Sequence, residues 1–441
     1  MFRQASEPHA KRQLVGFKNF KRLNPMTDKF KVYKFHHIDW WCADATSTHK
    51  RFSWGLGMTV VAKSDLSTGN SVFASYVLQS HDLVFSFTAP LVRSAAESKA
   101  DAPAMAAVPV PWYDPAAAHE LLAAHGLAVR AVGVLVEDAR LAYATAVANG
   151  ARGVLPPREL ADGATGTSQA VAEVALYGDV VLRFVSGSFQ GPYLAGYEPV
   201  VGGAGRSYGL QRLDHAVGNV PRLLEVIDYL AAFTGFHDFA EFTAEDIGTL
   251  DSGLNSMVLA SNNEMVLLPV NEPTFGTRRK SQIQTYLEQN GGPGLQHLAL
   301  KTDDIFATLC EMRARTDQGG FDFMPRASSE YYRNLPEKIG DALTAKQYKE
   351  AEELGILVDK DDQGVLLQIF TRPLSDRPTV FMEIIQRIGC ERELRGPAGE
   401  PVHDARGAPR VEQAGGCGGF GKGNFSELFK SIEEYERTLE V

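Results

Sequence analysis

Apolar and polar residues recur along the chain in a pattern that predicts one strand–helix unit twice. Residues 35–40 have the composition of a short strand, and the helix that follows begins near Asp44 and ends at one of two glycines. Residues 213–217 form a similar apolar run, followed by a helix with Pro221 in its first turn and a stop at Gly235. This repetition indicates that the two halves of the chain share one fold.

Two further segments are repeated in the same order. Residues 75–80 resemble residues 256–261, and each is followed by a polar turn and another apolar strand. Residues 132–136 resemble residues 297–301, and in both cases an aspartate after the strand is placed to cap a helix by accepting a hydrogen bond from a backbone N–H. Three repeated segments in one order predict that each half contains two βαβββ modules.

We therefore predict an α+β fold in which paired βαβββ modules curl into two half-open barrels with their helices outside. The glycine-rich segment 202–209 marks the border between the halves. The expected parts are an N-terminal arm at 1–29, an N-terminal non-catalytic domain at 30–200, and a C-terminal catalytic domain at 205–441 with a lid helix at 424–439.

Two linkers of biased composition support this division. The Ala/Pro-rich stretch 94–115 joins the modules of the first half, and the helix after it has Asp114 as its cap and Gly126 at its stop. The glycine-rich stretch 415–423 precedes the terminal helix. Because glycines permit hinge motion and the helix has one apolar stripe, we expect this helix to act as a lid over a barrel mouth.

Composition excludes several classes of protein. The chain has 441 residues, 44% of them hydrophobic and 22% charged, which is typical of a folded globular protein. Its net charge of −10 argues against a nucleic-acid partner, because a polyphosphate would be repelled overall. No apolar run approaches the roughly 18 residues that a membrane span needs.

The cysteines and the first residues bear on the compartment. The four cysteines are widely scattered without a CxxC pair, so reduced thiols and a cytoplasmic location are expected, with a plastid as the alternative. The basic N-terminal residues lack a Ser-rich amphipathic stretch, which argues against a transit peptide. We interpret them as a solvated arm.

Three residues of the second half combine into a candidate metal site. His215 and His297 stand at equivalent strand positions of its two modules. The hairpin of 364–370 and 379–385 follows, and strand alternation places Glu383 on a face that is otherwise apolar. A carboxylate is costly to bury there unless it is paired or bound to a metal.

Two imidazoles and one carboxylate from three strands form the facial triad typical of non-haem Fe(II) oxygenases. Such a triad leaves positions for a 2-oxo acid and for O2. The alternative is that Glu383 pairs with an arginine such as Arg387 or Arg372.

The first half does not repeat this triad. The position equivalent to His297 falls on Ala131 or Val132, and that of Glu383 falls near Arg183. An HxD motif at 37–39 is too short to predict iron binding, and the strand repeat explains its histidine. The segment 416–422 resembles a phosphate-binding loop, but it lacks the Ser or Thr that binds magnesium and no strand precedes it.

Longer motifs carry a resemblance to one family. The chain resembles the 4-hydroxyphenylpyruvate dioxygenases, most closely the plant ones, over roughly residues 30 to 441. The segments that carry it are RLDHAVGN at 212–219, GLQHLA at 294–299, FMEIIQR at 381–387 and GGFGKGNFSELF at 418–429. The resemblance implies a vicinal-oxygen-chelate (glyoxalase-like) fold and one Fe(II) per subunit. We also expect a homodimer, for which the metal-free first half is a reasonable place for the subunit interface. The first dozen residues match nothing in the family.

The resemblance also implies roles for individual residues. His215, His297 and Glu383 would be the iron ligands. The polar groups of the pocket would be Ser256, Asn271, Gln282, Gln296 and Gln368. The phenylalanines around an aromatic ligand would be Phe370 and Phe425, which sandwich it, and Phe381, Phe420 and Phe429. Because Gln296 and His297 are adjacent, an ideal strand would point them to opposite faces, so we expect a bulge or strand end there.

The implied reaction converts 4-hydroxyphenylpyruvate and O2 to homogentisate and CO2, in tyrosine and phenylalanine catabolism and on the route to plastoquinone and vitamin E. The alternatives are 4-hydroxymandelate synthase, which shares the substrate, an extradiol dioxygenase or glyoxalase on the same fold, and a metal-free protein that sequesters an aromatic ligand. No membrane partner is expected.

Overall fold

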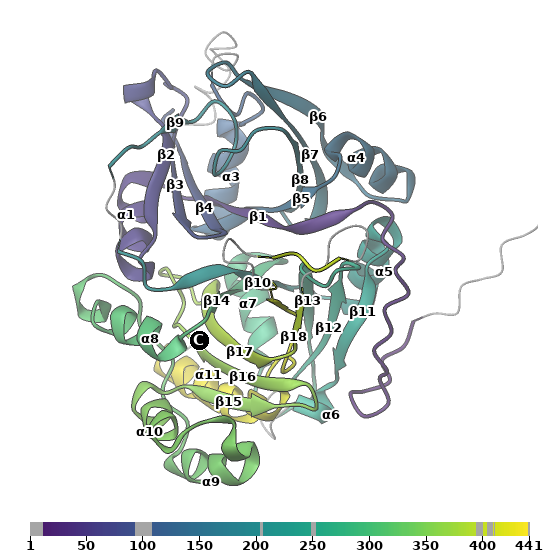
Figure 1. Cartoon of the computed structure of the whole chain (residues 1–441), viewed down its shortest axis with the longest axis vertical. Helices are drawn as coiled ribbons and strands as arrows, with labels where there is room; N and C mark the ends of the chain where they lie inside the picture. Colours follow the sequence, from purple (N-terminus) through teal and green to yellow (C-terminus); the bar gives the residue numbers. More distant parts are fainter. Residues whose placement is uncertain are drawn as a thin grey trace, which may run out of the picture.

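The computed structural model describes residues 12–92, 108–202, 206–247, 253–393, 400–403, 409 and 411–439. Most of the predicted Ala/Pro-rich linker, part of the Gly-rich border and the first eleven residues lie outside these ranges. Within them the chain forms two curved sheets with helices on their outer faces, the N-terminal half lying above the C-terminal half in Figure 1. The predicted α+β architecture of two half-barrels is confirmed.

The N-terminal sheet has the strand order β6-β7-β8-β5-β1-β4-β3-β2-β9. Its strands are β1 (Val32–Trp41), β2 (Thr59–Ser64), β3 (Phe73–Ser80), β4 (Leu83–Pro90), β5 (Ala128–Val136), β6 (Gly153–Asp162), β7 (Thr167–Tyr177), β8 (Val180–Gly187) and β9 (Glu198–Pro199). Its helices are α1 (Ala45–Leu56), α3 (Pro115–His125) and α4 (Ala139–Ala148).

The C-terminal sheet has the order β11-β12-β13-β10-β14-β17-β16-β15. Its strands are β10 (Leu210–Asn219), β11 (His237–Phe242), β12 (Leu254–Ala260), β13 (Leu267–Pro273), β14 (Gly294–Thr302), β15 (Leu357–Lys360), β16 (Gly364–Phe370) and β17 (Phe381–Gly389). The helices are α5 (Leu223–Thr234), α6 (Ala244–Ile247), α7 (Gln282–Asn290), α8 (Ile305–Arg313), α9 (Ser329–Ile339), α10 (Ala345–Leu354) and α11 (Phe425–Leu439).

The two sheets repeat one topology, as the sequence predicts. Reading outward from β1 and from β10, each strand of one half has its counterpart in the other, and β9 is an extra edge strand. The helix caps follow the prediction: Asp44, Asp114 and Asp138 each accept a hydrogen bond from a backbone N–H of the helix they precede. One detail differs, because Pro221 lies before the cap residue of α5 rather than in its first turn.

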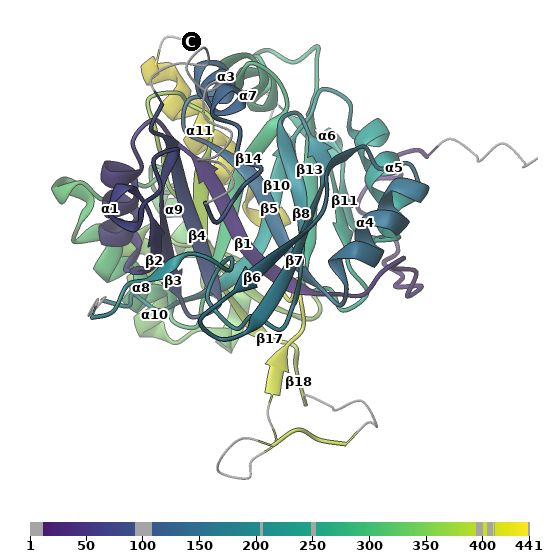
Figure 2. The ribbon, with the colours of Figure 1, turned by 90° about the horizontal axis from the view of Figure 1, so that it is seen from above.

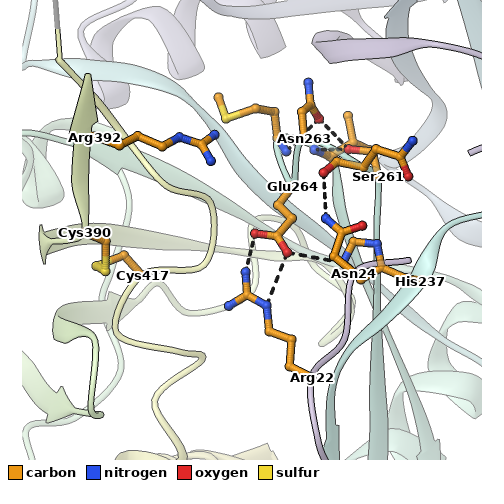
Figure 3. A network of polar contacts seen from close by, with 12 residues as sticks. Arg22, Asn24, His237, Ser261, Asn263, Glu264, Cys390, Arg392 and Cys417 are labelled. Carbon is orange, nitrogen blue, oxygen red and sulfur yellow. Dashed lines mark hydrogen bonds and ion pairs between the residues drawn. A yellow bond between two sulfur atoms is a disulfide. The ribbon is translucent and has the colours of Figure 1, made fainter. Parts of the chain in front are cut away.

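The N-terminal arm packs on the C-terminal half, so the prediction of a solvated arm is wrong for residues 12–29. Arg12 binds Asp228 and Asp238, and the ring of Phe17 stacks on Phe242 with centroids 5.6 Å apart. Further along, Arg22 pairs with Glu264, as Figure 3 shows. The basic residues of the arm therefore form ion pairs with acidic residues on and near β11. Composition alone does not show that these partners exist.

A disulfide joins Cys390 to Cys417, so the prediction that all four cysteines are reduced is wrong for this pair (Figure 3). It closes the base of a short hairpin of β18 (Glu391–Glu393) and β19 (Val411–Gln413), which projects from the barrel in Figure 2. Cys42 and Cys310 are free thiols, the first buried and the second exposed. The pairing brings the end of β17 next to the glycine-rich segment.

Candidate metal centre and pocket

Three neighbouring strands of the C-terminal sheet carry the predicted metal ligands. β10 supplies His215, β14 supplies His297 and β17 supplies Glu383. On the middle strand, β14, Ala299 pairs with His215 of β10 on one side and with Glu383 of β17 on the other. The three side chains therefore point to the same side of the sheet, into the half-barrel.

The three side chains converge on one point. Nε2 of His215 lies 3.1 Å from Oε2 of Glu383, and Nε2 of His297 lies 3.6 Å from the same oxygen. One donor atom from each residue lies within 4.8 Å of the others. Among the described residues this is the one His/Cys/Asp/Glu group with the spacing of a metal site.

Each histidine has its second ring nitrogen engaged elsewhere. Nδ1 of His215 is 2.9 Å from Oδ1 of Asp214, and Nδ1 of His297 donates to Oε1 of Gln296 over 2.9 Å. Nε2 of both rings is thereby turned toward Glu383 with its lone pair available to a cation. The donor set, two imidazole nitrogens and one carboxylate oxygen, fits Fe(II).

The ionisation states of Glu383 and His297 suit a cation. Burial lowers the pKa of His215, but its hydrogen bonds with Asp214 and Glu383 outweigh burial and raise it, so a cation would displace a proton there. Burial alone would raise the pKa of Glu383, but the hydrogen bonds and charges of the two histidines hold it at about 2. Burial lowers the pKa of His297, so its ring stays neutral. A carboxylate and a neutral imidazole are the forms that bind metal.

An ion-pair network holds His215 from behind. Arg387 donates two hydrogen bonds to the fully buried carboxylate of Asp214, at 2.9 and 2.7 Å. Its third nitrogen donates to the carbonyls of Cys417 and Gly419. The alternative prediction, a pair between Glu383 and Arg387, is wrong because Arg387 is committed to Asp214. Arg372 instead lies over the ring of Tyr435.

The expected bulge occurs at Gln296. Val217 of β10 pairs with His297, but the next residue, Gly218, pairs with Leu295, so Gln296 is the extra residue. The bulge turns the amide of Gln296 toward the same side as His297. There it also accepts a hydrogen bond from Asn271 over 3.3 Å.

A cavity of about 70 Å³ lies above the three ligands. Its lining includes nine of the ten polar and aromatic residues predicted for the pocket: Ser256, Asn271, Gln282, Gln296, Phe370, Phe381, Phe420, Phe425 and Phe429. Gln368 does not line it. The side chain of Gln368 is buried on β16 and packs against the backbone of Gly421. The two are so close that a Cβ on residue 421 would meet the amide of Gln368.

Aromatic rings surround the histidines. The ring of Phe381 stacks on His297 with centroids 4.9 Å apart, and Phe420 meets His215 edge-on at 5.2 Å. Helix α11 (lower centre of Figure 1) carries Phe425 and Phe429 into the lining. Apart from the three candidate metal ligands, most of the wall is apolar, which favours an aromatic ligand.

Sequence reasoning missed several residues of this site. Phe242, Leu254, Val258, Pro269 and Leu428 also line the cavity. Leu428 and Ile432 lie on the apolar stripe of the terminal helix, so the helical period was a signal for both. Asp214 was also missed as the partner of His215, and Arg387 as the partner of Asp214, although a buried carboxylate beside a ligand histidine is a usual second contact.

No protein-family model matches the chain. It is 58% identical over 433 residues to 4-hydroxyphenylpyruvate dioxygenase of Daucus carota, covering 97% of this chain and 93% of that protein. The enzyme of the same name from Arabidopsis thaliana is 57% identical over 443 residues, covering 99% and 95%. The one from Danio rerio is 32% identical over 419 residues, covering 92% and 91%.

Among solved structures, a mutant of 4-hydroxymandelate synthase from Streptomyces coelicolor superposes with a TM-score of 0.69 at 21% identity, covering 92% of this chain and 99% of that one. A fusion protein of a xylose isomerase-like barrel and a 4-hydroxyphenylpyruvate dioxygenase superposes with a TM-score of 0.61 at 16% identity, covering 93% and 54%. These two matches support the fold.

Proposed function

The chain belongs to the 4-hydroxyphenylpyruvate dioxygenase family, and we propose that it converts 4-hydroxyphenylpyruvate and O2 to homogentisate and CO2 with one Fe(II) bound by His215, His297 and Glu383. The observation that carries this proposal is the convergence of these three donors beneath an aromatic-walled cavity. Fe(II) bound there would supply the activation of O2 and a chelating site for the 2-oxo acid.

The remaining residues bind and position the substrate. The rings of Phe370, Phe381 and Phe425 exclude water and hold the aromatic ring. Ser256 and Asn271 lie opposite each other on β12 and β13, where their polar groups can hydrogen-bond the phenol. Gln282 and Gln296 complete the polar lining, and Gln296 also orients His297; Gln368 lies behind the lining and would act only by supporting it.

Helix α11 serves as the lid in this proposal. It is joined to the barrel by glycines at 415–423, and its Phe425, Leu428, Phe429 and Ile432 line the cavity. A closed helix would keep water from the bound substrate.

The test is O2 uptake by metal-free protein given 4-hydroxyphenylpyruvate, with and without Fe(II). Uptake is expected only with both, with homogentisate as product. Glu383→Ala should lower kcat by about 1,000-fold or more, because one carboxylate of the ligand set is lost. The matched control is Glu288→Gln, an exposed carboxylate of α7, which should leave activity unchanged.

Other products would redirect the proposal. Formation of 4-hydroxymandelate would make the chain a 4-hydroxymandelate synthase. Cleavage of catechols without a 2-oxo acid would indicate an extradiol enzyme. Ligand binding without iron and without O2 uptake would indicate a sequestering protein.

We further propose a homodimer that works in the cytoplasm. The N-terminal half holds no metal triad among its described residues and exposes apolar side chains such as Leu66 and Leu141, which suit a subunit contact. Sedimentation tests the dimer and cell fractionation tests the compartment. Within the described residues, no helix is long and apolar enough to cross a bilayer.

A further inference from the structure

The N-terminal half-barrel contains a cavity where the C-terminal half has its catalytic pocket. In the C-terminal half, His215, Ala299 and Glu383 stand side by side in the register; in the N-terminal half, the same row is His37, Gly133 and Arg183. By the same register Ala131 takes the place of His297. The cavity beside this row measures about 110 Å³, which is comparable in size to the catalytic one.

Arg183 makes this cavity unsuitable for a metal ion. Its guanidinium donates to Glu173 over 2.7 Å, to Asp39 over 3.0 Å and to Nε2 of His37 over 3.0 Å. All four side chains are buried. A fixed positive charge therefore stands where the other half gathers its metal donors, and it uses the carboxylates that might otherwise bind a cation.

Two polar groups of the lining are left without such partners. The hydroxyl of Tyr113 has no hydrogen-bond partner among the described residues, although the side chain is only 4% exposed. Arg130 makes no ion pair within the part of the chain that the structure describes, and its guanidinium lies 5.3 Å from the ring centroid of Trp41. One of its nitrogens donates to the carbonyl of Asp179. A buried hydroxyl without a partner is costly unless something occupies the space it faces.

Much of the remaining wall is aromatic. Trp41, Phe73, Trp112, Tyr193 and Tyr197 line the cavity with Tyr113. Flat rings of this kind favour an aromatic ligand, which they can contact face-on or edge-on. The remaining donors, the other N–H groups of the Arg130 guanidinium and the phenol of Tyr113, favour a ligand that brings an acceptor.

We propose that this cavity is a second binding site, which takes a small aromatic carboxylate with its ring among Trp41, Trp112 and Tyr113 and its carboxylate on Arg130. An aromatic cation is disfavoured because Asp39 and Glu173 are bound to Arg183. Asp114, the other acidic residue of the lining, caps α3. The site is separate from the catalytic pocket and needs no metal.

Tryptophan fluorescence provides a direct assay, because all four tryptophans, Trp40, Trp41, Trp54 and Trp112, lie in the N-terminal half. The probe is 4-hydroxyphenylacetate, which lacks the 2-oxo group needed for chelation in the catalytic site. Its amide, 4-hydroxyphenylacetamide, is the uncharged control. We expect saturable quenching by the acid in metal-free protein and at least about tenfold weaker binding of the amide, since a charge-assisted contact to Arg130 is lost.

Variants locate the probe. Arg130→Gln should weaken binding of the acid about tenfold or more and Tyr113→Phe a few-fold, whereas Arg158→Gln, an exposed arginine of β6, should have no effect. Phe381→Ala should also have no effect, because Phe381 lines the catalytic pocket and not this cavity.

Four results would overturn the proposal. The first is no saturable quenching up to about 10 mM, a concentration at which even a weak site fills. The second is quenching that both Arg130→Gln and Tyr113→Phe leave intact. The third is quenching lost in Phe381→Ala, which would assign the signal to the catalytic pocket. Stronger binding of phenethylamine than of the acid would assign the cavity to aromatic cations and also reject the proposal.

Discussion

Asp214 holds His215 by its Nδ1, and Arg387 holds Asp214 while also binding the carbonyls of Cys417 and Gly419. A single arginine thus joins a metal-ligand histidine to the segment that leads to Phe420 and α11. Both side chains of the pair are 0% exposed, so neither charge is screened by solvent. At the scale of the residue, the candidate centre is held together by side chains that are not among its three proposed ligands.

Arg387→Lys tests this link. A lysine keeps the positive charge but cannot make the two-pronged bond to Asp214 while also reaching both carbonyls. We expect the Kd for Fe(II) to rise by about 10- to 100-fold, the usual effect of losing a second contact of a ligand histidine. Anaerobic metal titration measures this. Arg392→Lys, an exposed ion pair with Glu412, is the control and should bind metal normally.

His36 makes stability depend on pH in the N-terminal half. Nε2 of His37 accepts a hydrogen bond from Arg183, so the ring proton of His37 is on Nδ1. This N–H donates to Nδ1 of His36 over 2.7 Å, which requires that Nδ1 of His36 carries no proton. Burial lowers the pKa of His36 from 6.5 to about 4. Below its ordinary pKa only the unfolded chain takes up the proton, so stability falls as pH drops from 6.5 toward 4.

The expected loss at pH 5, relative to pH 7.5, is about 1 to 2 kcal/mol from this group. Chemical denaturation at the two pH values measures it. In His36→Gln the difference between the two pH values should shrink by that amount, whereas the exposed His403→Gln should retain the full difference. An unchanged difference in His36→Gln would mean that other groups cause the acid sensitivity.

At the scale of the element, the glycine-rich segment and α11 shape the pocket. Gly421 has φ +73°, and a Cβ there would lie 2.5 Å from the amide of Gln368. Gly276 has φ +83° with nothing within 4 Å of its Cβ position. The two glycines carry the same left-handed strain and differ in what surrounds them.

Gly421→Ala should therefore lower kcat/KM by about tenfold, because Gln368 must move and the segment carrying Phe420 with it. Gly276→Ala should change kcat/KM by less than about twofold while costing a comparable 1 kcal/mol or so of backbone strain. Steady-state kinetics of both variants provides the comparison. Equal effects on kcat/KM would mean that backbone strain alone, not the contact with Gln368, is responsible.

The disulfide between Cys390 and Cys417 ties the glycine-rich segment to the end of β17. Protein unfolded without reductant should show two free thiols, Cys42 and Cys310, and four after reduction. Cys390→Ser should lower the free energy of unfolding by about 3.5 kcal/mol in the chain-entropy model, given the 27-residue separation. Cys310→Ser should have little effect. Four thiols without reductant would contradict the disulfide.

The sequence predicted the elements whose signals are local. Strand alternation and capping aspartates such as Asp138 lie within a few residues, and the internal repeat aligned the two halves. The repeat also located Ala131 as one of two candidates opposite His297, and the register selects it. The pairing of Cys390 with Cys417, by contrast, depends on where two distant segments meet, which periodicity does not encode.

The candidate site likewise combines local features, which the sequence predicts, with contacts between distant segments, which it does not. The convergence of the three candidate ligands follows from strand positions, but the contact of Arg387 with Asp214 requires the actual side-chain directions on β17 and β10. The bulge at Gln296 was expected only because two adjacent residues were both assigned to one pocket. The helices α9 and α10 lie between α8 and β15, where the repeat of the first half has no counterpart to align.

At the scale of the whole molecule, the N-terminal arm links the two halves. It runs over the C-terminal sheet before the chain enters β1, and its Phe17 stacks on Phe242, which in turn meets Phe425 edge-on at 5.6 Å. The ammonium group of Lys422 also lies over the ring of Phe17, 3.8 Å from its centroid. Phe242 and Phe425 both line the catalytic cavity, so the arm supports the pocket wall from outside.

Phe17→Ala should therefore affect substrate binding more than folding. Phe17 is 41% exposed, so its loss should cost only about 1 kcal/mol of stability, mainly the ring stack. Without that ring, Phe242 and Lys422 of the glycine-rich segment each lose a packing contact. We therefore expect KM for 4-hydroxyphenylpyruvate to rise several-fold with a smaller change in kcat. The control is Phe275→Ala, where a 76% exposed ring is removed. If both variants keep the native KM, the arm contributes to stability alone, and the pocket wall is held entirely from within the C-terminal half.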